Sequence, residues 1–127
     1  MTNAVITSHK LDFYHALWEP SALTQMLLDR LPNDDPYPNI PWAVFKVGTC
    51  HGQYRKTPEA YEILSVVNDN PGNGHLGDVF EWFEYACRRS RLPLRMLRFT
   101  NIPFMKHLIA KRGFCPIGQE DLEKTFT

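Results

Sequence analysis

The chain has 127 residues, of which 43% are hydrophobic and 22% charged, close to the average for globular proteins. This composition excludes a disordered tail or a coiled coil, and the length predicts a single domain over residues 1–127. The 14 Lys and Arg residues balance 14 Asp and Glu residues, which disfavours a dedicated binder of nucleic acid or of an anionic membrane. No apolar run approaches the length of a membrane span and no secretory leader is evident, so we expect a cytoplasmic protein.

In chain order, the first half predicts a short strand, two helices, a proline-rich loop and two strands: residues 4–6, 11–18, 21–31, 31–39, 42–47 and 53–56. Pro20 is expected to stop the first helix, since proline lacks the N–H that a helix needs. Gly48 and Gly52 are expected to form a turn between the two strands.

The second half alternates strands and helices more clearly. Residues 61–67 predict the central strand of a sheet, and a helix follows whose apolar side chains share one face: Leu76, Val79, Phe80, Phe83, Ala86 and Cys87. A strand over 94–99, a helix over 103–111 ended by Gly113, and a closing strand over 114–117 complete the predicted α/β sandwich. Trp82 falls outside the apolar stripe, so we expect its side chain to be partly exposed and to form a contact surface.

The three cysteines, Cys50, Cys87 and Cys115, are odd in number and widely spaced. A disulfide framework needs pairs, and no Cys or His spacing typical of a metal site occurs. We therefore expect three reduced, largely buried thiols and no metal.

Charge is unevenly distributed along the chain. Residues 61–84 contain five acids and no Lys or Arg, whereas residues 85–112 contain eight bases and no acid. The basic stretch predicts either an anionic ligand or acidic protein partner, or cations that complement the end of a helix. In the first case the contact is expected from Arg88, Arg89, Arg91 and one of the two strand arginines, Arg95 or Arg98.

The most informative segment joins the central strand to the first helix of the second half, from Val66 to Asp78. Glycines at 72, 74 and 77 permit backbone conformations that aim N–H groups at one point, and the helix start adds positive potential. This pattern predicts a phosphate or diphosphate site, with an ordinary tight turn as the alternative. It lacks the Gly-Lys-Ser/Thr ending of a Walker loop, and its late position with no acid on the following strand disfavours a Rossmann fingerprint.

The segment resembles the GCN5-related N-acetyltransferase (GNAT) superfamily. The family places four residues after a strand-ending Val and then Gly-x-Gly at a helix start, as in Val67, Asn68–Pro71 and Gly72-Asn-Gly74 here. The family has a second element, which consists of a strand, an Asn, a short helix and Gly-Phe. It is matched here by residues 94–99, Asn101, 103–109 and 113–114. Together the two elements cover about residues 60–117.

The resemblance implies a GNAT-like mixed, splayed sheet flanked by helices, in which strands 61–67 and 94–99 diverge. It also implies that acetyl-CoA binds in the cleft between these two strands. By analogy, the backbone of Val66 and Val67 pairs with the pantetheine arm and Asn101 lies near the thioester. The diphosphate is assigned by the same analogy to a run of six consecutive residues: Gly72, Asn73, Gly74, His75, Leu76 and Gly77.

Three positions depart from the family pattern. Asp69 stands where the family usually has Arg or Gln, and a carboxylate there repels a diphosphate unless it turns away. Ile109 replaces a Tyr that often protonates the departing thiolate, and the interval from Asn101 to Gly113 is one residue longer than usual.

Acetyl transfer needs a base for the attacking amine, and Glu62 on the central strand is the predicted one, against the alternative of a solvent-facing carboxylate. His75, His107, Cys115 and Tyr61 have possible chemical roles but are first expected to be loop or packing residues. The predicted function is acetyl-CoA-dependent N-acetyltransfer to an amine of a small molecule or protein. The alternative is a catalytically inactive GNAT-fold binding or structural module, for example a virion-associated phage protein.

Overall fold

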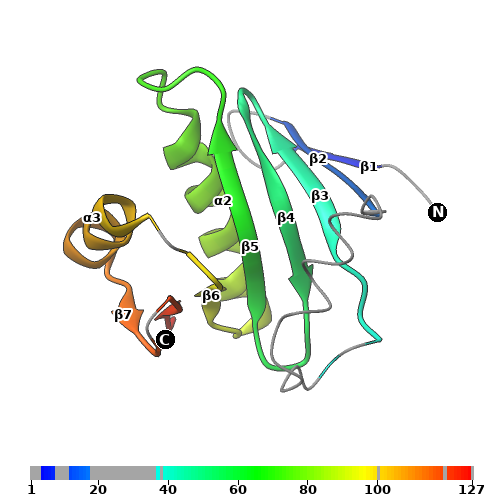
Figure 1. The fold of residues 1–127 in the computed structure, drawn as a ribbon. Coiled ribbons are helices and arrows are strands. Elements are labelled where there is room, and N and C mark those ends of the chain that lie inside the picture. The colour runs from blue at the N-terminus through cyan, green and yellow to red at the C-terminus, as the bar shows by residue number, and fades with distance from the viewer. Residues whose placement is uncertain are drawn as a thin grey trace, which may run out of the picture.

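A computed structural model describes the backbone of residues 4–7 and 12–17, and residues 37, 39–99, 101–118 and 120–126 in full (Figure 1). The strands within these residues are β1 (Ala4–Thr7), β2 (Asp12–Leu17), β3 (Ala43–Val47), β4 (Cys50–Lys56), β5 (Tyr61–Asn68), β6 (Leu94–Met96), β7 (Cys115–Pro116) and β8 (Leu122–Lys124). The described helices are α2 (His75–Ser90) and α3 (Ile102–Arg112). The helix predicted over 21–31 and most of the predicted loop lie outside the described residues.

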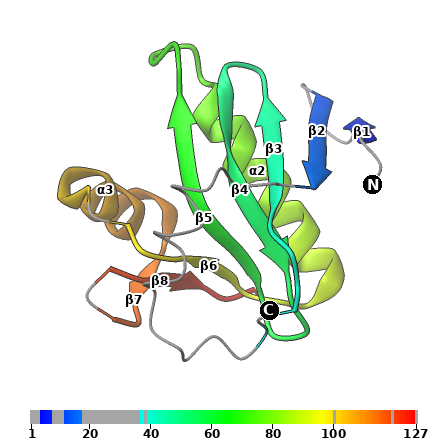
Figure 2. The same ribbon diagram turned by 45° about the vertical axis from the view of Figure 1, so that its right-hand side comes forward.

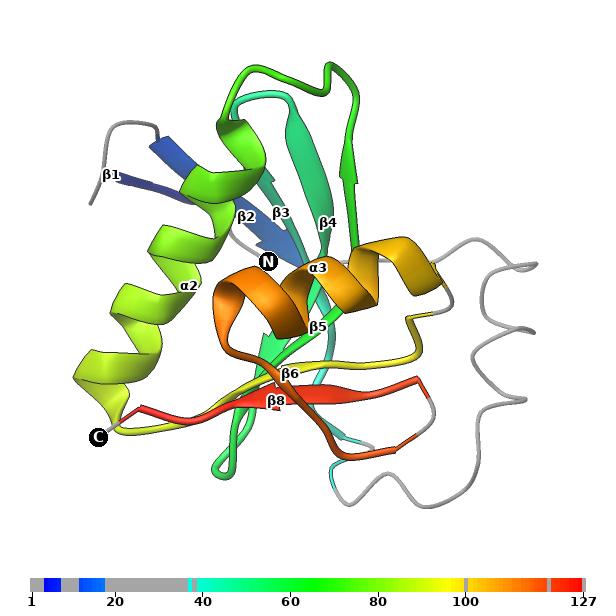
Figure 3. The same ribbon diagram turned by 90° about the vertical axis from the view of Figure 1, so that its left-hand side faces the viewer.

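The described strands form one mixed sheet in the order β1-β2-β3-β4-β5-β6-β8-β7. Strands β5 and β6 are parallel, joined through α2, and every other described neighbour pair is antiparallel. Figure 3 shows α2 and α3 on the same side of the strands. The predicted mixed α/β architecture is therefore confirmed.

Aromatic side chains fill the core between the sheet and α2. Phe83 of α2 is fully buried, and its ring meets four neighbouring rings edge-on at centroid distances of 5.2–6.4 Å: Phe45, Tyr54, Tyr61 and Trp82. Truncating such a residue typically costs about 3–5 kcal/mol. This packing fixes α2 across the strands, and with it the position of the loop that precedes the helix.

The helix predicted over residues 11–18 is wrong, because Asp12–Leu17 is strand β2. Its backbone pairs with β1 on one side and with β3 on the other, Phe13 opposite Val47. A segment this short cannot hold a helix by itself in water, whereas two neighbouring strands satisfy its backbone hydrogen bonds.

Two further boundaries differ from prediction. Gly52 lies inside β4 rather than in a turn, and a Cβ there would come 1.9 Å from the carbonyl oxygen of Ser65, so the close approach of β5 requires glycine. Strand β6 ends at Met96 rather than at residue 99, because Arg98 adopts a left-handed conformation, φ 60°. The short strand β8 was not predicted at all; it lies between β6 and β7.

Two predictions of exposure are also wrong. Trp82 is buried, since its ring packs edge-on against Phe83 at 5.2 Å. Cys50 and Cys87 are buried as expected, but Cys115 on β7 is exposed. Burial raises the pKa of the Cys87 thiol to about 12, which keeps that thiol protonated and unreactive at neutral pH. Neither described helix is long and apolar enough to cross a membrane.

Candidate functional site

The loop between β5 and α2 is built around two glycines in left-handed conformations. Gly72 has φ 92° and Gly74, the N-cap of α2, has φ 82°. A Cβ at either position would meet none of the described residues within 4 Å, so backbone conformation rather than crowding calls for glycine. The loop therefore presents its backbone toward open space.

Polar side chains hold this loop against the turn between β3 and β4. The amide nitrogen of Thr49 donates to Nδ1 of His75 at 3.0 Å, and the Thr49 hydroxyl donates to Oδ1 of Asn68 at 2.7 Å. Nδ2 of Asn73 donates to the same hydroxyl at 2.8 Å. The His75 ring lies against Gly48, where a Cβ would come 2.5 Å from Nδ1. His75 thus uses Nδ1 to anchor the loop, which leaves only Nε2 for a ligand.

The first turn of α2 carries N–H groups that the described residues do not use. The His75 amide donates to Oδ1 of Asn73 at 3.0 Å, and Asp78 donates to the carbonyl of Gly74 at 3.3 Å. No described group accepts from the amides of Leu76 and Gly77, and Gly74 has no side chain to cap them. A helix start with free N–H groups attracts anions.

Arg112, which is not among the predicted site residues, adds a cation to this turn. Its Nη2 atom lies 3.1 Å from the position of a Cβ on Gly77, and its guanidinium stacks over the Phe80 ring, 5.3 Å from the centroid. Arg112 ends α3, 35 positions along the chain from Gly77, so no local pattern could have revealed the contact.

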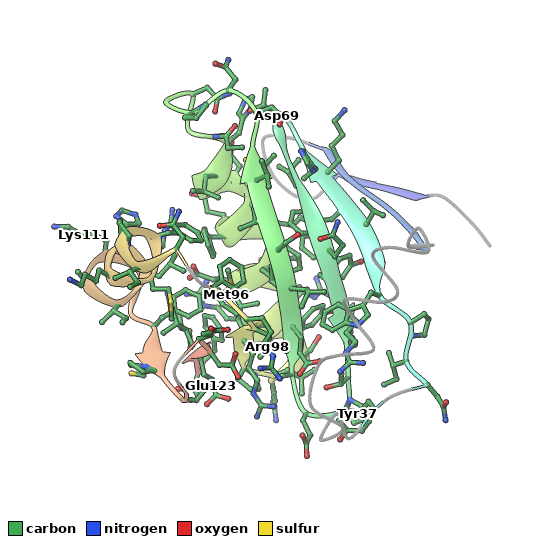
Figure 4. The ribbon with its side chains drawn as sticks, in the orientation of Figure 1. Tyr37, Asp69, Met96, Arg98, Lys111 and Glu123 are labelled. Atoms are coloured by element: carbon green, nitrogen blue, oxygen red, sulfur yellow. The ribbon has the colours of Figure 1, made fainter. Side chains whose placement is uncertain are left out.

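Asp69, which would repel a diphosphate, is directed elsewhere. Its carboxylate lies 3.2 Å from Nε2 of His51 on β4, and its amide donates to the carbonyl of Thr49 at 3.0 Å. Figure 4 places Asp69 at the end of β5, beside the loop. Both contacts tie Asp69 to the strands rather than to the first turn of α2.

Strands β5 and β6 separate soon after they meet (Figures 1 and 2). They pair over three residues only, Tyr61–Ile63 with Leu94–Met96, and the last hydrogen bond runs from the Leu97 amide to the Ile63 carbonyl at 2.9 Å. A β-bulge at Leu64 then bends β5, and the left-handed Arg98 turns the other strand away. Among the described strands, none pairs with this edge of β5 from Leu64 to Asn68.

This edge of β5 contains Val66 and Val67, the two valines that were predicted to pair with the pantetheine arm. Val66 packs against the core from the edge of the cluster, whereas Val67 is 48% exposed. Asn101 lies at the N-terminus of α3, where Oδ1 accepts from the Phe104 amide at 3.0 Å. Its first role is therefore to cap a helix, with only its side-chain N–H groups left for a ligand.

Glu62, the predicted base, is not a solvent-facing carboxylate. It is buried on the sheet face opposite α2, and its Oε1 accepts from Nε of the equally buried Arg55 at 2.7 Å. Arg55 also donates to the carbonyls of Tyr37 and Ile40 and lies 4.5 Å from the ring centroid of Trp42. The pair fastens Tyr37, Ile40 and Trp42 to the sheet.

The same face has a row of alternating charges. Strand register sets Glu62 opposite Arg55 on one side and Arg95 on the other, and Arg95 opposite Glu123. Arg95 donates to Glu123 at 2.7 Å and lies 3.8 Å from Glu59. Because opposite charges directly across strands attract, this row specifies the register of β4, β5, β6 and β8.

Another unpredicted cluster surrounds Glu84 in the middle of α2. Glu84 is buried, and three cations from three elements approach its carboxylate: Lys124 at 2.9 Å, Arg88 at 3.7 Å and Arg112 at 3.8 Å. The cluster joins α2 to the end of α3 and to β8. No sequence signal marks it, since the three partners are brought together only by the fold.

The predicted contact surface near the end of α2 is partly occupied by internal contacts. Arg88 is 61% exposed but lies near Glu84 and over the Phe126 ring, and Arg89 donates to the Tyr85 hydroxyl at 2.7 Å. Arg91 is exposed and ends α2 with φ 58°. The cations therefore complement the helix end, while their use by an acidic partner stays a prediction.

No known family model matches the chain, and no curated protein matches it either.

Proposed function

We propose that the protein binds acetyl-CoA between β5 and β6 and transfers its acetyl group to an amine of a small molecule or protein. One observation carries the proposal: the edge of β5 from Leu64 to Asn68, which pairs with no described strand, leads directly into the glycine loop and the first turn of α2. A free strand edge binds an extended chain of amides, and a helix start binds an anion. The amide-containing pantetheine arm and diphosphate of CoA have these features in that order.

Charge near the loop supports the same ligand. Arg112 brings a guanidinium to the first turn of α2, while the Asp69 carboxylate is occupied by His51. The resemblance to the GNAT superfamily supports it further, because the glycine motif and the separation of β5 from β6 fall where that resemblance expects them.

In the proposed reaction, the amine nitrogen attacks the thioester carbonyl, a C–N bond forms, the C–S bond breaks and the thiolate leaves. The N–H groups of Leu76 and Gly77 hold the diphosphate, and the β5 edge aligns the pantetheine arm. Glu62 can accept the amine proton only through a carboxylate that also holds Arg55.

A second candidate function follows from that ion pair. A Glu62 carboxylate held by Arg55, together with an apolar Ile109 where the family often has Tyr, favours a module that binds CoA without transferring the acetyl group. Such a module serves binding or assembly, for example within a virion, or holds an acidic partner.

Thermal unfolding with acetyl-CoA and with desulfo-CoA tests binding, and release of free thiol in the presence of amines tests transfer. A ligand at a hundredfold excess over Kd stabilises the folded state by about 2.7 kcal/mol. No shift at millimolar cofactor would overturn both candidates. A shift with no thiol release from any amine would leave the binding module and exclude the enzyme.

A further inference from the structure

Two arginines of the described chain adopt left-handed backbone conformations, which suit glycine far better. Arg91 has φ 58° and Arg98 has φ 60°. For Arg91 the reason is local, since it ends α2 and its amide donates to the Cys87 carbonyl. Arg98 ends no helix and needs a different explanation.

The neighbouring chain holds Arg98 in this conformation. Its amide donates to Oδ1 of Asp121 at 2.9 Å, and the next amide, of Phe99, donates to the Glu120 carbonyl at 2.9 Å. Two hydrogen bonds from one segment therefore fix the turn. Strain maintained in this way is common where a side chain has a function.

Arg98 directly follows the residue that makes the last hydrogen bond between β5 and β6, from Leu97 to Ile63. Its side chain is exposed, and no carboxylate of the described residues lies within ion-pair distance of it. Figure 4 places it well away from Asp69 and the loop end of β5. By contrast, Arg95 on β6 is occupied by Glu59 and Glu123.

We propose that Arg98 selects an acceptor amine that carries a carboxylate or phosphate group close to its nitrogen. The inference rests on the proposed transferase function. If the diphosphate lies at the glycine loop and the pantetheine arm follows β5, the thioester reaches the point where the strands part. Arg98 stands at that point with no carboxylate of the described residues within ion-pair distance of its side chain. A guanidinium binds carboxylate or phosphate through two parallel hydrogen bonds.

Arg98 takes no part in the transfer itself. The amine nitrogen forms the C–N bond, the C–S bond of the thioester breaks, and the proton lost by nitrogen balances the thiolate that becomes CoA thiol. Arg98 places the nitrogen by holding the anionic group of the acceptor. It is a specificity residue, and its removal should act on KM for anionic acceptors more than on kcat.

The test measures thiol release from acetyl-CoA with paired amines: β-alanine against β-alaninamide, and phosphoethanolamine against ethanolamine. Wild type should have a higher kcat/KM for the anionic amine than for its neutral counterpart in one or both pairs. The pair with the larger ratio of the two kcat/KM values shows whether carboxylate or phosphate is preferred. R98A should reduce that ratio about tenfold, R98K should restore part of it, and salt should weaken it in wild type.

The matched control is Arg91, also exposed and left-handed. R98G and R91G both remove one cation and one strained residue, so both should raise the melting temperature. Only R98G should lower the preference for anionic amines. Equal ratios in wild type and R98G overturn the inference while the transferase stands; no thiol release from any amine overturns the transferase and the inference with it.

Discussion

The two ends of α2 differ in how their polar groups are satisfied. At the N-terminal end, a glycine cap leaves two N–H groups without partners among the described residues, next to the Arg112 guanidinium. Toward the C-terminal end, a buried carboxylate, Glu84, gathers three cations, and Arg91 closes the helix. The N-terminal end of α2 is arranged to receive an anion from outside the protein, whereas the cations further along the helix already have an anion within the protein, the Glu84 carboxylate. Arg112 contacts both.

The largest effect is expected at the Glu84 cluster in the middle of α2. E84A should destabilise the fold by about 3 kcal/mol, because it leaves Lys124 and Arg112 without their buried counter-charge. Urea denaturation measures the loss, with E81A as control, since Glu81 is exposed on the same helix. An E84A protein as stable as E81A would show that the cluster contributes nothing to the fold.

At the N-terminal end of α2, G74V should abolish CoA binding. It should destabilise the fold by only about 1–2 kcal/mol, the cost of placing a non-glycine residue in a left-handed conformation. The added side chain enters open space, so the fold should survive. Calorimetry of CoA binding and urea denaturation check the two effects separately. G118A is the control, since Gly118 has no left-handed φ and its Cβ would make ordinary contacts at 3.8 Å. Complete unfolding of G74V would mean that the glycine serves the turn alone.

The third test separates two arginines that share Glu84. R112A should weaken CoA binding about tenfold, whereas R88A should leave it unchanged. Both lie 3.7–3.8 Å from Glu84 and both stack over a phenylalanine ring, at 5.1 Å for Arg88 and 5.3 Å for Arg112. Only Arg112 reaches the start of α2. Equal affinities of the two variants would remove Arg112 from the anion site.

The smallest effect is expected at Asp69. D69R should tighten CoA binding several-fold at low salt and less at high salt, because it replaces a repelling charge with an attracting one. The gain is limited because the wild-type carboxylate is already paired with His51. D69N separates loss of negative charge from gain of positive charge. Weaker binding by D69R at low salt would mean that the loop does not meet a phosphate.

Elements with strong local patterns were predictable from the sequence. The apolar run of β5, the helical spacing of α2 and Gly113 at the end of α3 each contain their own signal, and each is confirmed. Strand β2 was mistaken for a helix because its partner β3 lies far along the chain. Strand β8 is short and half polar, so its place between β6 and β7 depends on pairing rather than on pattern.

The site was predictable in its backbone but not in its charges. Glycines of the loop are visible in the sequence, because a single residue type imposes the conformation. By contrast, Arg112 reaches Gly77 only after α3 has packed near α2. The pair of Glu62 and Arg55 is close in sequence, but it depends on the register of the β4–β5 hairpin, which no charge pattern in the sequence sets. Long-range contacts leave no periodic trace in the sequence. A charge count over residues 85–112 could not tell the arginines that contact a carboxylate from Arg98, which has none within ion-pair distance among the described residues.

The three-residue pairing of β5 with β6 has a consequence for the order of folding. Strands β3, β4 and β5 are joined by short turns and form local contacts, whereas β6 can dock only after α2 has crossed the sheet. Because non-local pairing forms late, we expect mutations in β6 to have low φ-values and mutations in the β4–β5 hairpin high ones. Once folded, the unit of β6, α3, β7 and β8 should open more readily than the hairpin, so the Leu97 amide should exchange with solvent before the amides shared by β4 and β5.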